Sequence, residues 1–553
     1  MTRQNAYMTM HKKILPRIAV VEDNSSARLN LRSHLLATDD YDIASYSSGQ
    51  ELRNGLKKYN FDLILTDFHL GQTRNGAEWI EQLKASHMLN ATTGIVFITS
   101  DRTPQCISQI LDTNPDQLIL KPYTINHLTR TVSHSLKFRA LAHDVFEHIQ
   151  HARWSQAISQ IKTLLQQEKC KRYKNDLLKV QGRTFIAMGE YAQAEALYSE
   201  VLANSDHILW AHWGRIKSQF LAGDWASCQA MLKILVDHRL TKDKAHEWLA
   251  CVAIGQKDYV GAEQELDCIR ENDLSLQATK LKVLSYKMQQ KEDEATRLLE
   301  KKRQSNFSIK ERFDEYTLEL ARLFLQRAEN SKPGDEQQDT IDKAKALLYK
   351  AKNLYRDNKS EQERDCMMAL ACLLEGNLER AEKIMLQEDM QDFTRQKITM
   401  LTDAVKVWFG LGHPEKAKTI LSACDDYFNQ QQDQLDSMIS DDLIYRAEKA
   451  IGVSKERAIG INQQGLALHA KGDYNQALEQ FNRAYKMFPG VPAFGLNLLQ
   501  CLCDAKRTTF KNSKLSSLLN ELQKLTLTQQ NQQRLDKVLQ KARKMPELAN
   551  QLN

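Results

Sequence analysis

The stretch Arg17-Ile-Ala-Val-Val-Glu-Asp23 sets an apolar run directly before two carboxylates. The same arrangement recurs at Asp62–Thr66, which Asp67 follows, and a third apolar run is Gly94–Thr99. Near-continuous apolar runs of this length are typical of parallel strands that helices cover on both faces. With the runs Asp42–Tyr46 and Gln117–Leu120 they predict five strands, and the longer amphipathic stretches between and after them predict helices.

We therefore expect residues 14–138 to form an α/β domain of five βα units, a flavodoxin-like (βα)5 fold. After about residue 141 the strand pattern disappears, so the rest of the chain is predicted to be all-α. A chain of 553 residues is too long for a single hydrophobic core. Its 9 Pro and 21 Gly leave little room for loops, which favours long helical stretches.

The helical part shows a repeated pattern of small and aromatic residues. Small residues at positions 157, 194, 228, 262 and 295 are 37, 34, 34 and 33 residues apart. This period and the residue types resemble the tetratricopeptide repeat (TPR), in which small residues let paired helices approach and aromatic residues fill the space between them. We assign repeat-packing positions to Gly182, Tyr191, Ala194, Gly465, Gly472, Tyr474, Ala477 and Phe481. A helical bundle without repeats is the alternative, mainly for residues 280–450.

These patterns predict a sequence of domains and junctions. The helix near 124–138 continues without Gly or Pro to residue 151, which predicts a near-continuous helical junction after the α/β domain. The expected parts are an N-terminal extension (1–13), the α/β domain (14–138), a helical junction and first helix pair (139–174), TPR-like repeats (175–325), a loop insertion (326–342), TPR-like repeats with an inserted helix near 430–450 (343–492) and a basic helical segment (493–553).

Polar residues follow four of the five predicted strands. Glu22 and Asp23 follow the first, Asp67 the third, Thr99 ends the fourth and Lys121 follows the fifth. In open parallel sheets, ligands bind at the carboxyl ends of the strands. The order and spacing of these residues resemble the receiver domain of bacterial two-component response regulators, over residues 14–138.

The resemblance implies a phosphorylation site with a divalent cation. Asp67 would be the phosphoacceptor. Asp23 and Asp67 would ligate Mg²⁺ directly, Glu22 through water, and His69 through its backbone carbonyl. Three converging carboxylates repel one another unless a cation neutralises them, and oxygen ligands suit Mg²⁺. The His69 side chain could also approach the site, but the carbonyl role is the favoured interpretation.

The resemblance also implies how a phosphoryl group would be sensed. Thr99 and Lys121 would each contact a phosphoryl oxygen, and the Lys121–Pro122 bond would be cis, an isomer largely confined to X-Pro. Leu118 stands where the family often has a Tyr or Phe that changes its orientation. The segment between Asp67 and residue 76 is longer than in many receivers. We expect signalling by a smaller packing change.

Composition and charge exclude several classes of protein. No stretch approaches the ~18 apolar residues of a membrane span, so we expect a cytoplasmic protein without membrane contact. The ten scattered Cys predict reduced, mostly buried thiols rather than a zinc site or disulfides. Residues 505–544 hold ten Lys/Arg against two acidic residues, and a solvated helical face is favoured there over nucleic-acid binding.

The leading functional hypothesis is a two-component response regulator and not an enzyme, because no catalytic or DNA-binding motif follows residue 141. A sensor histidine kinase or phosphotransfer protein would phosphorylate Asp67, and the TPR surface would bind a protein partner. The alternatives are a phosphorylation-independent scaffold and, less favoured, a nucleic-acid-binding regulator. A homodimer through the receiver stays open. The sequence does not identify the kinase, the partner or the direction of the switch.

Overall fold

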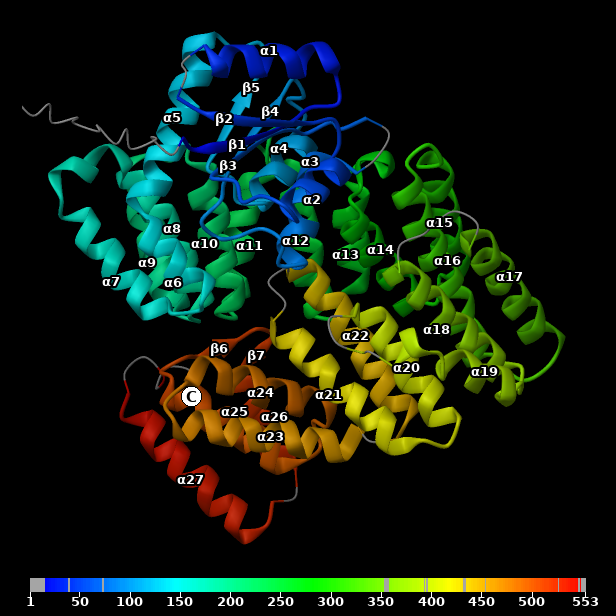
Figure 1. Cartoon of the computed structure of the whole chain (residues 1–553). Helices are drawn as coiled ribbons and strands as arrows, with labels where there is room; N and C mark the ends of the chain where they lie inside the picture. The colour runs from blue at the N-terminus through cyan, green and yellow to red at the C-terminus, as the bar shows by residue number, and fades with distance from the viewer. Residues whose placement is uncertain are drawn as a thin grey trace, which may run out of the picture. The chain divides into compact units, whose positions relative to one another are not determined.

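The computed structural model describes residues 15–37, 40–71, 74–352, 358–391, 393, 396–430, 434–452, 454–525, 527–545 and 548. The N-terminal extension expected at 1–13 lies outside the described residues. The five-stranded parallel sheet expected from the sequence is present, with the strand order β2-β1-β3-β4-β5 (Figure 1). Its strands are β1 (Arg17–Val21), β2 (Asp42–Tyr46), β3 (Leu63–Asp67), β4 (Gly94–Thr99) and β5 (Gln117–Leu120).

Alternating residues of the strands build one core on each face of the sheet. Ile18 and its neighbours on that face pack with helices α1 (Ser25–Leu36) and α5 (Ile125–Leu141). Ala19 and the residues on the opposite face pack with α2 (Gly49–Leu56), α3 (Gly76–Ala85) and α4 (Pro104–Asp112). Both faces are thus covered, which explains why the strands are apolar at nearly every position.

Helices make up most of the described chain after α5. They are α6 (His143–Gln150), α7 (Trp154–Leu165), α8 (Lys174–Ala187), α9 (Tyr191–Asn204), α10 (Leu209–Leu221), α11 (Trp225–Leu235), α12 (Lys242–Gly255), α13 (Tyr259–Asp267), α14 (Leu276–Met288), α15 (Glu292–Ser305), α16 (Lys310–Asn330), α17 (Asp335–Lys352), α18 (Asn358–Leu374), α19 (Leu378–Met385), α20 (Ile398–Gly410), α21 (Pro414–Gln430), α22 (Gln434–Ala450), α23 (Ser454–Ala470), α24 (Tyr474–Met487), α25 (Pro492–Asp504), α26 (Leu515–Lys524) and α27 (Gln529–Arg543). Ala142 separates α5 from α6, where a near-continuous helix was expected.

Successive helices pack as pairs, and the pair α23–α24 shows why small residues recur. A Cβ at Gly465 would lie 2.7 Å from the ring of Phe481, which is 1% exposed. Gly472, with φ +81°, makes the turn that joins the two helices, and Ala477 is fully buried. The short side chains therefore set how closely the two helices approach.

The other assigned positions occupy comparable places in their own helices. Gly182 is buried in α8, and Ala194 is fully buried in α9, the helix that Tyr191 begins. Tyr474 begins α24 and packs against the buried cluster around Phe481.

Two parts of the helical region differ from the expectation. The loop insertion expected at 326–342 is mostly helical, because α16 runs to Asn330 and α17 begins at Asp335. Most of its polar side chains lie on the outer faces, whereas Gln326, Ala328, Thr340 and Ile341 are buried, so the segment is amphipathic rather than irregular. In the basic segment expected to be helical, a short antiparallel hairpin joins β6 (Thr509–Phe510) to β7 (Ser513–Lys514).

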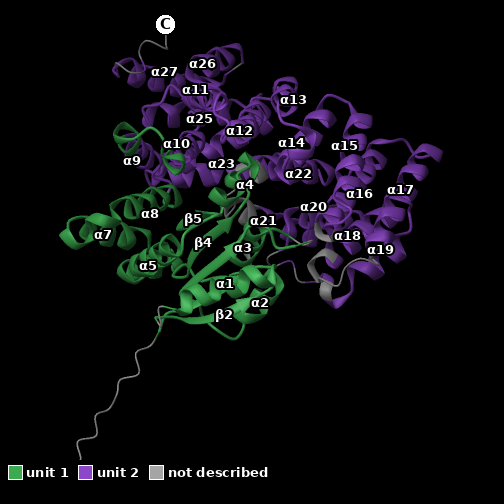
Figure 2. Cartoon of the chain, turned by 90° about the horizontal axis from the view of Figure 1, so that it is seen from above, with its two compact units in different colours: residues 1–188, 200–211 green, residues 189–199, 212–553 purple. Residues whose placement is uncertain are grey.

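The chain divides into two compact units (Figure 2). The first unit contains residues 1–188 and 200–211, and the second contains 189–199 and 212–553. The α/β domain and the first helices after it therefore belong to the same compact unit. Within the part of the chain that the structure describes, no helix combines the length and the apolar character of a membrane-spanning segment.

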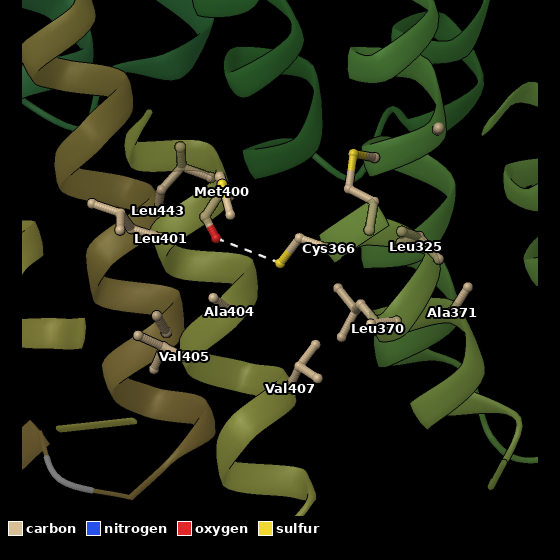
Figure 3. Close-up of a cluster of buried hydrophobic side chains, with 14 of the residues drawn as sticks. Leu325, Cys366, Leu370, Ala371, Met400, Leu401, Ala404, Val405, Val407 and Leu443 are labelled. Carbon is tan, nitrogen blue, oxygen red and sulfur yellow. Dashed lines mark hydrogen bonds between the residues drawn. The ribbon is translucent and has the colours of Figure 1, made fainter. Parts of the chain in front are cut away.

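The second unit has an extended buried core. Figure 3 shows a part of it, where the thiol of Cys366 on α18 donates to the carbonyl of Met400 on α20 across 3.7 Å, amid aliphatic side chains. Nine of the ten cysteines are buried and all ten are free, Cys268 being the exposed one. The nine buried thiols are thus part of the core, and burial raises the pKa of one of them, Cys228, to about 12.

Candidate functional site at the carboxyl ends of the strands

The carboxyl ends of the strands bring three of the predicted site residues into direct contact. The Lys121 ammonium donates to Asp67 Oδ2 at 2.7 Å and to Glu22 Oε2 at 2.9 Å. Both carboxylates are buried, Glu22 being 2% exposed and Asp67 9%. A single cation therefore bridges two carboxylates that follow the adjacent strands β1 and β3.

Strand pairing explains this convergence. In the parallel register, Val21 of β1 lies opposite Thr66 of β3, so Glu22 and Asp67 extend from neighbouring strand ends. The Lys121 N–H donates to the Thr99 carbonyl at 2.8 Å, which fixes the start of the next segment beside β4. The Lys121–Pro122 bond is cis, the isomer that the resemblance implied.

At both Glu22 and Lys121, burial and the hydrogen bonds between them have opposite effects on the pKa, and the net shift of each pKa is upward. Burial raises the pKa of Glu22; the hydrogen bond from Lys121 opposes this, nearby Asp67 adds to it, and the net direction is upward. Burial would lower the pKa of Lys121, but the hydrogen bonds to Asp67 and Glu22 outweigh it and raise the pKa. The ammonium is therefore held in its charged form beside the two carboxylates.

The third carboxylate, Asp23, lies at the rim of the site. It is exposed, accepts a hydrogen bond from the Asn24 N–H at 2.9 Å, and lies beside Gly71. In the described part of the chain, no three His, Cys, Asp or Glu side chains converge on a point that could hold a metal ion. The donor chemistry suits a hard divalent cation. However, the ammonium of Lys121 lies between the two buried carboxylates.

The predicted sensing residues differ in how they are held. Thr99 is fully buried, and its hydroxyl accepts a hydrogen bond from the Asp101 N–H at 3.0 Å. Its hydroxyl also lies 3.9 Å from the Cys106 thiol. Leu118 on β5 packs partly buried against the core beneath α4. It has no ring to turn, so a change at Thr99 can reach β5 through this packing and through the hydrogen bonds that join β4 to β5.

The segment after Asp67 contains one contact that the sequence did not predict. The ring of His69 meets Asp101 at 3.0 Å, which ties the segment after β3 to the segment after β4. The hydrogen bond from the Thr103 N–H and the contact with His69 lower the pKa of Asp101 despite its partial burial. The sequence assigned His69 to the site through its carbonyl and did not single out Asp101, so only their approach in space reveals the pair.

Two further residues position the site and were missed. Arg28 donates through Nη1 to the carbonyl of Glu22 at 2.5 Å and to that of Asp23 at 3.2 Å. A Cβ at Gly76 would lie 2.1 Å from the carbonyl oxygen of Asp67, so only glycine fits there. For Gly76, the sequence offered one indication, which was a glycine at the start of a predicted helix.

The comparison with known proteins agrees with this arrangement. Residues 18–133 match the response regulator receiver domain family. This segment is a receiver domain. It is the receiver of a two-component response regulator, and the all-helical region follows it.

Solved structures similar to this part of the chain have TM-scores of 0.20 to 0.21. One is a CheY-like receiver domain protein from Methanospirillum hungatei JF-1, at 21% identity over 23% of this chain and 97% of that one, with a TM-score of 0.21. Another is the chemotaxis response regulator CheY4 of Vibrio cholerae, at 21% identity over 22% and 98%, with a TM-score of 0.20. A third is the signal receiver domain of a modulated diguanylate cyclase from Desulfovibrio desulfuricans G20, at 26% identity over 23% and 98%, with a TM-score of 0.21.

At the opposite end of the receiver domain, cations hold the carboxyl end of α4. Three consecutive carbonyls, those of residues 113–115, accept hydrogen bonds from Lys84 of α3, Arg183 of α8 and Lys179 of α8, respectively. The Lys179–Pro115 distance is 2.6 Å and the Arg183–Asn114 distance is 3.4 Å. Positive charge stabilises the negative end of a helix. We call Lys84, Lys179 and Arg183 the α4 clamp.

The α4 clamp connects the receiver domain with the helices that follow it. Two of its three cations belong to α8, which lies beyond the receiver boundary in the sequence. His134 of α5 also contacts Asp176 of α8 at 2.9 Å. A displacement of α4 or α5 would therefore act directly on the first helices of the all-helical region.

Proposed function

We propose that this protein is a response regulator that accepts a phosphoryl group on Asp67 from a sensor histidine kinase or a phosphotransfer protein. The observation that carries the proposal is the buried Asp67 carboxylate at the end of β3, in contact with Lys121 and next to Glu22. A carboxylate so placed can act as a nucleophile toward phosphorus. The receiver domain assignment supports the same chemistry.

In the proposed reaction, an oxygen of Asp67 forms a bond to phosphorus as the bond to the donor's leaving group breaks. With a phosphohistidine donor the imidazole leaves, and with acetyl phosphate acetate leaves. Lys121 then donates to an oxygen of the transferred group, and the Thr99 hydroxyl to another. In the present geometry Lys121 already contacts Asp67 and Thr99 bonds to Asp101. Both contacts would change on phosphorylation.

A Mg²⁺ ion would be held by Asp23 and Asp67, by Glu22 through water, and by the His69 carbonyl. When bound, it would neutralise negative charge on the carboxylates and the phosphoryl group. The chain's own part is to present oxygen donors and to withdraw Lys121 from Asp67, since the ammonium lies between Asp67 and Glu22. The buried carboxylates have oxygen chemistry that fits this ion.

The all-helical region is proposed to be a TPR-like array that binds a protein partner. The support is the succession of helix pairs with small residues at their contacts, as at Gly465 and Ala477. We infer that phosphorylation changes this binding through the α4 clamp, because the clamp joins α4 to α8. Because Leu118 has no aromatic ring that could change its orientation, we propose the contacts of the α4 clamp as the principal route from the site to the helical array.

Phosphorylation of the purified full chain tests the proposal. Incubation with Mg²⁺ and acetyl phosphate, followed by phosphate-affinity electrophoresis, should give one shifted species that alkali removes. Asp67→Asn should abolish it and chelation of Mg²⁺ should prevent it. Asp42→Asn, at the distant start of β2 where Asp42 pairs with Arg17 on the surface, should leave it unchanged. A wild-type chain that shows no Asp67-dependent adduct would exclude the proposed reaction.

The scaffold alternative predicts a different dependence on Asp67. If the array binds its partner without regard to the receiver, Asp67→Ala and wild type will capture the partner equally under phosphorylating conditions. Under the proposed function, the two proteins will differ only when the phosphoryl donor is present. The comparison therefore separates the two functions with a single substitution.

A further inference from the structure

Helix α22 stands outside the succession of helix pairs. In the sequence, α21 before it pairs with α20, and α23 after it pairs with α24. Helix α22 instead packs mainly against α12, α14, α20 and α21, with a smaller contact to α23, and α12 and α14 lie far earlier in the chain (Figure 1). Helices α12 and α20 are the first helices of the pairs α12–α13 and α20–α21. Helix α22 therefore lies across one face of the array rather than extending it.

The face of α22 that meets the array is apolar and narrow. Leu443, Ile444 and Ala447 are buried in the core formed with α16, α18 and α20. Ile439 contacts both this core and the neighbouring core around α12. On the opposite face, Tyr445 is 48% exposed. The spacing of three and four residues is that of an amphipathic helix bound in a groove.

The surface under α22 carries buried charge. A cavity of about 50 Å³ lies between α22 and the array. Aliphatic and charged side chains line it together, the charged ones being Lys280 and Lys287 of α14, Glu319 and Arg322 of α16, and Asp442 of α22. The contact is thus not filled as tightly as an ordinary core.

The charges around this cavity are unequally paired. Lys280 pairs with Glu319 at 2.9 Å, and Arg322 with Glu363 at 3.0 Å and with Asp403 at 3.2 Å. Lys287, in contrast, donates its hydrogen bond to the neutral amide of Gln326. Burial lowers the pKa of Lys287 to about 8. A carboxylate at this point would therefore stabilise its charged form.

The carboxylate of α22 in this region is engaged elsewhere. Asp442 lines the cavity, but its Oδ2 accepts a hydrogen bond from Arg446, one turn later on the same helix, at 2.8 Å. Arg446 in turn approaches the sulfur of Met288 at the end of α14. Helix α22 therefore acts on Lys287 through the charge of Asp442, which opposes the lowering of the Lys287 pKa, whereas the hydrogen bond of Asp442 goes to Arg446.

We propose that the face formed by α12, α14 and α20, which we call the α22 site, binds an amphipathic helix of a partner protein, and that α22 occupies it when no partner is bound. The partner helix carries aliphatic residues at the spacing of Ile439, Leu443 and Ala447, and a carboxylate directed at Lys287. The proposal depends on the proposed function in one respect only, which is that the helical array is the part of the chain that binds a protein partner.

A peptide with the sequence of residues 434–451 tests the α22 site without a phosphoryl donor. The receptor is the full chain with Leu443→Asp and Ile444→Asp, which removes the apolar face of α22. Fluorescence anisotropy should show that this variant binds the labelled peptide at least about tenfold more tightly than wild type. Tyr445→Asp, on the exposed face of the same helix, should behave as wild type. Equal binding by all three proteins would overturn the proposal.

Charge gives a second test that does not depend on opening the site. In the wild-type chain, hydrogen exchange should be faster in α22 than in α14 and α20, and excess peptide should accelerate it further. A peptide with Asp442→Lys should lose this effect, and Lys287→Glu in the chain should restore it. Exchange of α22 only together with α20, unaffected by peptide, would show that α22 is a fixed part of the core.

The two proposals fail separately. Peptide binding without any Asp67 adduct would leave the α22 site and remove the phosphoswitch. An Asp67 adduct in a chain whose α22 site takes no peptide would leave the phosphoswitch and place partner binding elsewhere.

Discussion

At the scale of single residues, space around the Cα atom decides what each glycine does. Two glycines in α23 show this. Gly465 faces the buried ring of Phe481 across a short gap, whereas a Cβ at Gly460 would meet nothing within 4 Å. Neither position has a positive φ. The same residue type in the same helix is thus required for packing at one position and not at the other.

Substituting these two glycines gives opposite predictions. Gly465→Ala should destabilise the second unit by about 1–3 kcal/mol, because the methyl group would overpack the helix pair. Gly460→Ala should stabilise it by about 0.5–1 kcal/mol, because alanine is the better helix former. Thermal unfolding followed by circular dichroism measures both. A Gly465→Ala protein as stable as Gly460→Ala would contradict the close approach at Phe481.

At the scale of elements, the α4 clamp joins the carboxyl end of α4 to α3 and α8. Burial, and after it the charge of Arg183, lowers the pKa of Lys179, while Asp116 and Asp176 oppose the change; the net result is a pKa lowered from 10.5 to about 7. Burial also lowers the pKa of Lys84 to about 8. The positive charges at this helix end therefore lower the pKa of the neighbouring lysines. The pH of the solution then decides how many of these lysines are charged.

The clamp predicts a pH dependence of stability. Between pH 7 and 10.5 the unfolded chain keeps a proton on Lys179 that the folded chain has released, so stability should rise with pH, by at most about 1.4 kcal/mol per pH unit for this group. Below pH 7 both states hold the proton and this slope vanishes. Lys179→Met should reduce the rise of the unfolding midpoint between pH 7 and 9. Lys174→Met, exposed on the same helix, should keep it.

At the scale of the whole molecule, the C-terminal hairpin connects distant parts of the second unit. The Lys511 N–H donates to the Gly223 carbonyl at 2.6 Å, and Arg507 donates to the carbonyl of Ala222. Phe510, 1% exposed, packs against Gly223, whose φ is +76°. The hairpin therefore packs and hydrogen-bonds against the turn between α10 and α11.

Removing the ring of Phe510 should loosen this connection. Phe510→Ala is expected to cost about 3–5 kcal/mol locally, because a fully buried aromatic side chain leaves a cavity. Hydrogen exchange should accelerate both in the hairpin and at the α10–α11 turn. Thr509→Ala, exposed on the same strand, serves as the control and should change neither segment. Acceleration confined to the hairpin would argue against a connection.

The same contacts bear on the nucleic-acid alternative. Arg507 donates to Asn475, Arg534 to Asn497 and Gln500, and Lys541 pairs with Asp504. Basic residues engaged within the fold are less available to phosphates. We expect the full chain to show no steep salt dependence of binding to DNA or RNA in anisotropy titrations. Strong binding at low salt that fell steeply with added salt would favour the nucleic-acid function instead.

The sequence by itself determined the α/β architecture and which residues stand at the strand ends. It could do so because apolar periodicity and the residue after each strand are local properties, and because parallel strands place Glu22, Asp67, Thr99 and Lys121 at one edge. It misplaced the loop at 326–342, because an amphipathic helix with a polar outer face has the composition of a loop.

Only the tertiary structure decided how these residues are paired. The bridge from Lys121 to Glu22 and Asp67, the His69–Asp101 contact and the position of α22 across α12 and α14 join residues far apart in the chain. A sequence pattern does not specify such contacts, because they depend on how elements pack rather than on the propensity of any segment. The same reason hides the α4 clamp, whose cations meet the α4 carbonyls only after α8 has packed against the receiver domain.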